Sequence, residues 1–223
     1  MSIAIAFDIY GTLINPHGVV TELAHHLGDR AQPFSNLWRD KQLEYSFRRG
    51  LMGCYQNFPV CTRQALDYAD AVMQTGLDES VKAKLMALYG ELPAFDDVAQ
   101  SLEAMSREGW KLYAFSNGTA DAVNGLLQSA GIDHHFAGVV SVDALQTFKP
   151  DPRVYRYFME TADTDAERCW LVSSNPFDVI GAVAAGMQAA WLQRTPTAVF
   201  DPWELQPSCK ITRLDELKDS ISN

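Results

Sequence analysis

The alternation of apolar and polar stretches predicts strands and helices that follow one another along most of the chain. An apolar run at residues 3–7 stops at Asp8 and is followed by Gly11, which is typical of a buried strand and a turn. Further strands are expected at residues 110–115, 138–141, 169–173 and 187–192. Helices are expected at residues 97–108, 120–130, 151–160, from about 174 to 186, and at 214–221. Because strands and helices alternate, the expected fold class is α/β, with a Rossmann-like, doubly wound parallel sheet.

The stretch between the first strand and about Leu92 is helical in its periodicity and contains no convincing strand. Helices are expected there at residues 34–51, 62–75 and 79–88. The strand–helix alternation begins only after Pro93. We therefore expect a helical cap, residues 15–92, inserted into a core made of residues 1–14 and 93–223. A cap over the carboxyl edge of the sheet can keep water out of a site there.

Bulk composition narrows the class of protein and of partner. The chain has 223 residues, of which 47% are hydrophobic, enough for a substantial core. Its formal net charge of −10 argues against a nucleic-acid or anionic-membrane partner. No apolar run reaches the ~20 residues that span a bilayer, and no cleavable apolar segment opens the chain. A cytoplasmic protein is therefore expected.

Cysteines and histidines give no disulfide or metal signal. The four cysteines form no Cys-x-x-Cys pair, which suggests free thiols at Cys54, Cys61, Cys169 and Cys209. The histidine pairs at 25–26 and 134–135 lack carboxylate or cysteine partners at metal-ligand spacing. No metal site is predicted from these residues.

Polar clusters follow the predicted strands at four places. They are Asp8, then Ser116 with Asn117, then Lys149, and finally residues 173–175 with Asp178. In a doubly wound fold these strand ends converge on one crevice. Each cluster alone is more often structural, but four in this order indicate a site.

The segment Phe7-Asp8-Ile9-Tyr10-Gly11-Thr12-Leu13 resembles motif one of the haloacid dehalogenase (HAD) superfamily. Over nearly its whole length the chain resembles the type II (S)-2-haloacid dehalogenases of that superfamily. The other supporting segments are residues 37–39 with 41–45, 116–118, 149–151 with 153–155, and 173–175 with 178. The string Trp-Arg-x-Lys-Gln-Leu-Glu-Tyr at residues 38–45 is the most discriminating, because caps differ greatly between branches of the superfamily.

A missing second carboxylate supports the same branch on chemical grounds. Most phosphatases of this superfamily carry Asp-x-Asp in motif one, and this chain has Asp8-Ile9-Tyr10. A phosphatase needs an acid to protonate its alkoxide leaving group and Mg²⁺ to bind the phosphate. Halide leaves without a proton. Tyr10 therefore favours a reaction that needs neither the acid nor a metal, and no cofactor is expected.

The resemblance implies a two-step hydrolysis of a small anionic 2-haloacid. Asp8 attacks C2 from the side opposite the halogen and forms an ester. Water then attacks the ester carbonyl carbon and frees a 2-hydroxy acid, with one inversion at C2. The family resemblance implies (S) substrate, (R) product and a homodimer.

The resemblance also implies roles for individual residues in binding. Arg39 and Asn117 would hold the departing halide, since arginine is always charged and has several donors. The ring edges of Phe58 and Phe177 would line that cradle. The substrate carboxylate would be bound by Ser116 and by the backbone N–H groups of Ile9 and Tyr10.

The remaining roles concern catalysis. Lys149 would offset the charge of Asp8 and keep it ionised. Asp178, with Asn175 and Ser173, would position or deprotonate the hydrolytic water. Thr12 would orient Asp8 by a hydrogen bond, and Tyr155 would orient Lys149.

Two other functions are compatible with the same fold. A Mg²⁺-dependent HAD phosphatase of a small metabolite would release phosphate from a generic aryl phosphate. A non-catalytic HAD-like binding protein would lack one chemical residue, and none is missing here. Taken singly, Arg39 also fits a solvated helix charge, Asp178 a helix cap, and Phe58 and Phe177 the core.

Overall fold

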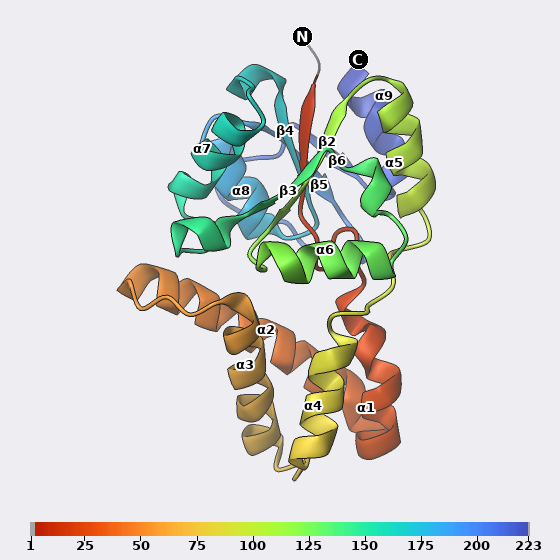
Figure 1. Ribbon diagram of the computed structural model, residues 1–223, viewed down its shortest axis with the longest axis vertical. Helices are drawn as coiled ribbons and strands as arrows, with labels where there is room; N and C mark the ends of the chain where they lie inside the picture. The colour runs from red at the N-terminus through yellow and green to blue at the C-terminus, as the bar shows by residue number, and fades with distance from the viewer. Residues whose placement is uncertain (1–2, 223) are drawn as a thin grey trace.

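The computed structural model describes residues 3–222 and contains a six-stranded, wholly parallel sheet (Figure 1). Its strands are β1 (Ala4–Phe7), β2 (Lys111–Ser116), β3 (Gly138–Ser141), β4 (Cys169–Ser173), β5 (Gln188–Leu192) and β6 (Cys209–Ile211). Their order is β3-β2-β1-β4-β5-β6. The chain therefore winds outward from β1 in both directions, and the doubly wound α/β prediction is confirmed. The topological switch point lies at β1, where ligands bind in folds of this kind.

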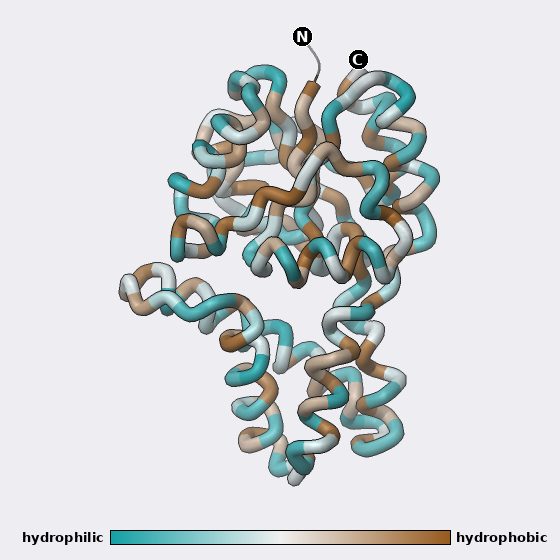
Figure 2. The backbone as a smooth tube through the Cα atoms, in the orientation of Figure 1, coloured by the Kyte–Doolittle hydropathy of each residue, from teal (hydrophilic) through white to brown (hydrophobic). Residues whose placement is uncertain are grey.

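Helices cover both faces of the sheet. One face carries α5 (Val98–Arg107), α6 (Ala120–Ser129) and α9 (Leu217–Ser222), and the other carries α7 (Pro152–Thr161) and α8 (Pro176–Ala184). Residues alternate between these faces along β1, where Ile5 and Phe7 pack with the first group and Ala4 and Ala6 with the second. Because both faces are covered, β1 is apolar throughout. The helices in Figure 2, by contrast, change between hydrophobic and hydrophilic residues from turn to turn.

A second, all-helical layer lies beyond the carboxyl edge of the sheet, in the lower half of Figure 1. It contains η1 (Pro16–Val19), α1 (Val20–Leu27), η2 (Gly28–Arg30), α2 (Ala31–Met52), α3 (Phe58–Met73) and α4 (Glu79–Leu88). Side-chain N-caps start two of the α-helices in this layer, since Asn57 accepts from the N–H of Val60 and Asp78 from that of Val81.

The two chain segments that join the layers run side by side. The N–H of Phe95 donates to the carbonyl of Leu13 at 2.9 Å, and the N–H of Asn15 donates to the carbonyl of Pro93 at 3.0 Å. Ile14 and Ala94 form an antiparallel bridge between them. The helical layer is thus tied to the sheet next to the turn that follows β1.

The observed boundaries differ in places from those predicted. The predicted helix at 34–51 begins three residues earlier, and that at 62–75 begins four residues earlier. Helix α1 and strand β6 were not predicted, because α1 has only eight residues and β6 only three. The closing helix is divided into η6 (Leu214–Glu216) and α9. Three further 3₁₀ turns are η3 (Asp133–His135), η4 (Val142–Leu145) and η5 (Ala166–Arg168).

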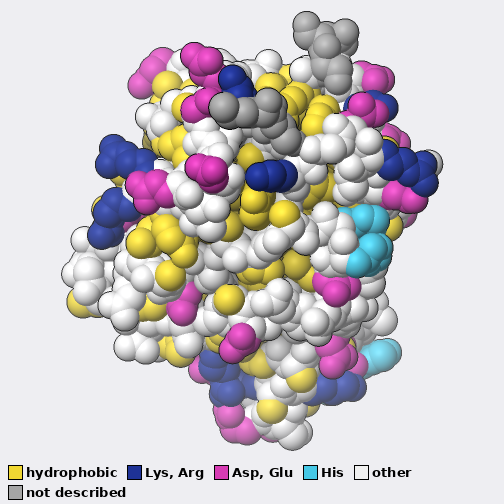
Figure 3. All heavy atoms as spheres, turned by 45° about the horizontal axis from the view of Figure 1, so that its top comes forward, with side chains coloured by type: hydrophobic (Ala, Val, Ile, Leu, Met, Phe, Trp, Pro, Cys, Tyr) yellow, Lys and Arg dark blue, Asp and Glu magenta, His cyan; other side chains and the backbone are white. Residues whose placement is uncertain are grey.

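The surface carries charges of both signs (Figure 3), and the four cysteines form no disulfide among the described residues. On the face shown in Figure 3, acidic and basic side chains are interspersed among neutral and hydrophobic ones. Cys54, Cys61, Cys169 and Cys209 all have free thiols, as predicted. Between residues 3 and 222, none of the helices has both the length and the apolar character required to cross a bilayer.

Candidate active site

Asp8 follows β1 at the switch point, and its two oxygens have different surroundings. Oδ2 accepts three hydrogen bonds, from Thr12 Oγ1 at 2.9 Å, Ser173 Oγ at 3.1 Å and Asn175 Nδ2 at 2.7 Å. Oδ1 faces Lys149 Nζ at 3.2 Å. The side chain of Asp8 is 13% exposed, so it is held firmly and still accessible. The predicted hydrogen bond from Thr12 to Asp8 is therefore present.

The turn after β1 aims the hydroxyl of Thr12 back at Asp8. Gly11 has φ +89°, a conformation that favours glycine. The N–H of Ser174 donates to Thr12 Oγ1 at 2.9 Å, so this oxygen acts as an acceptor there. Its single proton is then left for Asp8. The Ser174 hydroxyl donates to the carbonyl of Gly11 at 2.6 Å and closes the turn against the end of β4.

Lys149 lies between two carboxylates. Its ammonium is 3.2 Å from Asp8 Oδ1 and 2.9 Å from Asp178 Oδ2, and it also donates to the Phe115 carbonyl at 2.8 Å. All three of its protons thus have an acceptor, and the side chain is only 1% exposed. One positive charge is shared by two negative ones, which leaves the trio with a net charge of about −1 when all are ionised.

Asp178 is the most deeply buried carboxylate of the site, with 0% exposure. Burial raises its pKa, the nearby charge of Asp8 raises it further, and Lys149 acts in the opposite direction. Tyr155 donates to Asp178 Oδ1 at 2.8 Å. The expectation that Tyr155 orients Lys149 is thus corrected, because its hydroxyl reaches Lys149 only through Asp178. Gly181 makes room for Tyr155, since a Cβ there would lie 2.7 Å from Tyr155 Cζ.

Arg39 reaches from α2 to the loop after β1. Its Nη2 donates to the carbonyl of Tyr10 at 3.1 Å. Burial raises the pKa of the Tyr10 hydroxyl well above its usual value, with a further contribution from Tyr89. Asn117 is held by the backbone of Lys149. Its Oδ1 accepts from the N–H of Lys149 at 2.9 Å, so its amide nitrogen points away from that N–H.

Several donors near Asp8 are left for a ligand. The backbone N–H groups of Ile9 and Tyr10 meet no acceptor within the described part of the chain. Ser116 is buried, and its Oγ accepts from the N–H of Gly118 at 3.0 Å, so its own proton is not used in that bond. Such a group of donors at the end of a strand suits a small anion.

The two predicted phenylalanines lie at different places. Phe58 is 4% exposed, and its ring centre is 6.1 Å from that of Tyr10. Phe177 contacts Phe47 of α2 edge-to-face at 4.9 Å. It lines a largely apolar cleft of about 580 Å³ between α2 and residues 147–152, with Trp203 at its rim. Phe58 therefore belongs to the wall beside Tyr10, and Phe177 to the boundary between the helical layer and the sheet.

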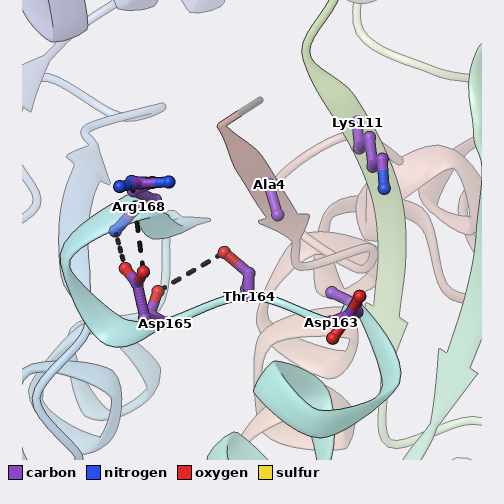
Figure 4. Close-up of a pocket in the computed structure, with 7 residues that line it drawn as sticks. Ala4, Lys111, Asp163, Thr164, Asp165 and Arg168 are labelled. Atoms are coloured by element: carbon purple, nitrogen blue, oxygen red, sulfur yellow. Dashed lines mark hydrogen bonds and ion pairs between the residues drawn. The ribbon is translucent and has the colours of Figure 1, made fainter. Parts of the chain in front are cut away.

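A separate hollow of about 480 Å³ lies at the opposite, amino edge of the sheet (Figure 4). Lys111 and Arg168 line it together with Asp163 and Asp165. Asp165 is 4.0 Å from Arg168, and both side chains are exposed. Ala4, at the start of β1, forms part of its wall, so the length of β1 separates this hollow from Asp8. None of the predicted site residues lines it.

The structure brings in two residues that the sequence analysis did not select. Arg194 donates twice to the carbonyl of Thr12, at 3.0 and 2.7 Å, and pairs with the buried Asp97 at 2.7 Å. Gln42 accepts from Arg39 at 2.6 Å. Arg194 could have been found as a charge that follows a predicted strand. Gln42 lies within the string at residues 38–45 that supports the family resemblance, but that string gave it no role of its own.

Comparison with known proteins shows the family of the chain. The family model of haloacid dehalogenase-like hydrolases matches residues 4–186. The chain is 36% identical to haloacetate dehalogenase H-2 of Moraxella sp. (strain B), over 98% of this chain and 97% of that protein. It is also 36% identical to an (S)-2-haloacid dehalogenase of Pseudomonas sp. (strain YL), over 94% of this chain and 90% of that protein.

A solved structure extends the agreement to the whole fold. The L-2-haloacid dehalogenase from Xanthobacter autotrophicus with chloropropionic acid covalently bound superposes with a TM-score of 0.91. It is 30% identical, and the comparison covers 100% of this chain and 99% of that one. The resemblance read from the motifs is thus confirmed. The chain belongs to the haloacid dehalogenase-like hydrolases.

Proposed function

We propose that this protein is a hydrolytic dehalogenase that converts short (S)-2-haloalkanoic acids into (R)-2-hydroxy acids and halide. The observation that carries the proposal is the environment of Asp8, a well-held carboxylate with Tyr10 where a phosphatase has its second acid. Burial makes the Tyr10 hydroxyl an even weaker acid than usual. The reaction must therefore release a group that leaves as a stable anion. The relatives named above support a halide.

In the first step Asp8 displaces the halogen from C2. Oδ1 is the attacking oxygen, because Oδ2 is surrounded by three donors whereas Oδ1 has only Lys149 beside it. The substrate carboxylate is bound by the free N–H groups of Ile9 and Tyr10 and by Ser116. The C2–halogen bond breaks as the Oδ1–C2 bond forms, and the halide takes both bonding electrons. Arg39 and Asn117 receive it, and Phe58, in the wall beside Tyr10, excludes water from this side, whereas Phe177 lies at the boundary between the helical layer and the sheet.

In the second step water hydrolyses the ester. With Oδ1 bonded to C2, Oδ2 becomes the ester carbonyl oxygen, and it carries the negative charge when water adds to the carbon. The donors already on Oδ2, from Thr12, Ser173 and Asn175, then stabilise that charge as an oxyanion hole. Asp178 accepts the proton of the water, and its raised pKa makes its carboxylate a stronger base. The carbon–Oδ1 bond then breaks, and Asp178 returns its proton to Oδ1, which leaves as the hydroxyl oxygen of the product. Asp8 keeps the oxygen of the water, and the remaining proton of that water passes to solvent, so that Asp8 is again a carboxylate.

Ser173→Ala should separate the two steps. It removes one donor from Oδ2, the oxygen on which charge grows in the second step, and leaves Oδ1 and Lys149 in place. We expect the overall rate to fall about 10²–10³-fold and the ester on Asp8 to accumulate. Intact-protein mass spectrometry after mixing with substrate should show a mass increase equal to the substrate minus hydrogen halide. An unmodified variant of equally low activity would contradict the assignment of Oδ2 to the oxyanion.

A phosphatase is the alternative, and one assay separates the two. Purified protein is incubated with (S)-2-chloropropionate, with and without EDTA, and free chloride is measured. A parallel sample receives a generic aryl phosphate with Mg²⁺, and free phosphate is measured. We expect chloride release that EDTA leaves unchanged, and no phosphate release. No halide from any of a panel of short 2-haloacids would refute the proposed function.

The organisation of the chain is part of the same proposal. We regard residues 1–14 and 93–223 as the core and residues 15–92 as a cap that closes the site. The contact between Arg39 and the Tyr10 carbonyl supports this division of roles. A homodimer is a prediction from the family resemblance, and a cytoplasmic location is a prediction from the sequence. The exposed apolar side chains of Leu51 and Met52 at the end of α2 are compatible with a subunit contact, and light scattering of the purified protein measures the oligomeric state.

A further inference from the structure

Two hydrogen bonds fix the guanidinium of Arg39. Nη2 donates to the carbonyl of Tyr10 at 3.1 Å, and Nη1 donates to the side-chain oxygen of Gln42 at 2.6 Å. The carbonyl of Tyr10 belongs to the loop after β1, whereas Gln42 lies three residues beyond Arg39 on α2. The direction of the remaining N–H groups of Arg39 therefore depends on where the oxygen of Gln42 is held.

Gln42 is completely buried, and its amide can face in only one direction. Nε2 donates to Thr62 Oγ1 at 2.6 Å, and the Thr62 hydroxyl donates its single proton to the carbonyl of Phe58 at 2.9 Å. Since Thr62 has no second proton, the end of the amide that faces it must be the donor. The oxygen is thereby turned to Arg39 and to the hydroxyl of Tyr89, 3.2 Å away. A flipped amide would place two donors against each other.

Aromatic packing isolates this chain of hydrogen bonds from water. The ring of Tyr89 lies 5.2 Å from that of Trp38 and 5.4 Å from that of Tyr10. Trp38 also donates to the carbonyl of Thr62 at 2.8 Å, which ties α2 to α3 at the same point. In such surroundings a hydrogen bond is electrostatically strong, and a misdirected polar group is costly.

We infer that Gln42 is a positioning residue, which sets the direction of the Arg39 guanidinium toward the departing halide. This inference rests on the proposed function, in which Arg39 receives the halide. Gln42 contacts neither Asp8 nor the substrate in that scheme and acts only through Arg39. Charge develops on the halide in the transition state, so a misdirected Arg39 lowers kcat more than it raises KM.

The variant Gln42→Met tests this directly, because methionine keeps the length of the side chain but has no amide. With (S)-2-chloropropionate, we expect kcat to fall about 10²-fold while KM changes by less than about 3-fold. The inhibition constant of bromide, a product analogue that the same guanidinium would hold, should rise about 10-fold. A merely structural loss would lower the amount of folded enzyme and leave the inhibition constant unchanged.

Two further variants serve as controls. Thr62→Val removes the group that fixes the amide and should resemble Gln42→Met in both measurements. Thr62→Ser keeps the hydroxyl, so its kcat and its inhibition by bromide should stay near those of the wild type. If Gln42→Met fails to fold, the comparison of Thr62→Val with Thr62→Ser tests the role of Gln42 instead.

Two results would overturn the inference. One is a Gln42→Met enzyme with wild-type kcat and wild-type bromide inhibition. The other is an equal loss in Thr62→Val and Thr62→Ser. Wild-type protein that releases no halide from any 2-haloacid is a different outcome, since it refutes the proposed function itself.

Discussion

Asp8→Asn is expected to abolish halide release, with a loss of at least about 10⁴-fold in kcat/KM. An amide has no anionic oxygen to form the ester, and no other carboxylate can take its place, because Asp178 is completely buried behind Lys149. The fold should persist. The substitution is nearly isosteric, and Lys149 keeps its contact with Asp178 at 2.9 Å. Halide release is measured by ion chromatography and folding by thermal unfolding.

A matched variant controls for the change of charge alone. Asp29→Asn makes the same substitution at an exposed position in η2, and its activity should equal that of the wild type. If Asp8→Asn kept more than a small percentage of the wild-type rate, the nucleophile would have to be another group. The mechanism proposed above would then be wrong in its first step.

Lys149→Met is expected to produce the second largest loss, in both activity and stability. Without the ammonium, two carboxylates face each other in a buried site, and Asp178 loses the group that opposes its desolvation. The pKa of Asp178 is thereby raised further, which favours its protonated form, and a protonated Asp178 cannot serve as a base, a loss of about 10²–10⁴-fold in rate. Removing one partner of a buried ion pair costs about 3–5 kcal/mol of stability.

The stability loss should depend on pH in a defined direction. The pKa of Asp178 in the folded protein is already above its ordinary value, and loss of Lys149 raises it further. The folded state then holds a proton that the unfolded state has released, so stability falls as the pH rises from the unfolded pKa through the folded one. Urea denaturation at about pH 5 and about pH 8 should show a larger deficit at the higher pH. Lys111→Met, at an exposed lysine, should show no such dependence, and an equal deficit at both values would contradict the argument.

The carboxyl-edge site could be predicted because local sequence determines where each strand ends. The apolar run before Asp8 and the short strand before Ser173 each stop at a polar residue, and the parallel topology then brings those ends together. Elements of ordinary length, such as α4 and β4, were predicted at their observed bounds for the same reason. Strand β6 was missed because its three residues form a strand only through pairing with β5.

Contacts that depend on tertiary packing could not be predicted from the sequence. Tyr155 donates to Asp178 rather than to Lys149, since α7 packs against α8 and Gly181 leaves space for the hydroxyl. Arg194 reaches the carbonyl of Thr12 across 182 positions of the chain. Gln42 belongs to the string at residues 38–45, but its role is seen only when α3 places Thr62 against it. In each case the partner comes from a distant segment, and no local pattern identifies it.

The most direct test of the central claim is a single turnover in ¹⁸O-water with enzyme in excess over (S)-2-chloropropionate. If Asp8 forms the ester and water attacks its carbonyl carbon, the hydroxyl oxygen of the lactate is unlabelled. The label is then found on Asp8, in the peptide that contains this residue. Label in the first lactate, with Asp8 unlabelled, would mean that water attacks C2 itself and would contradict the covalent mechanism.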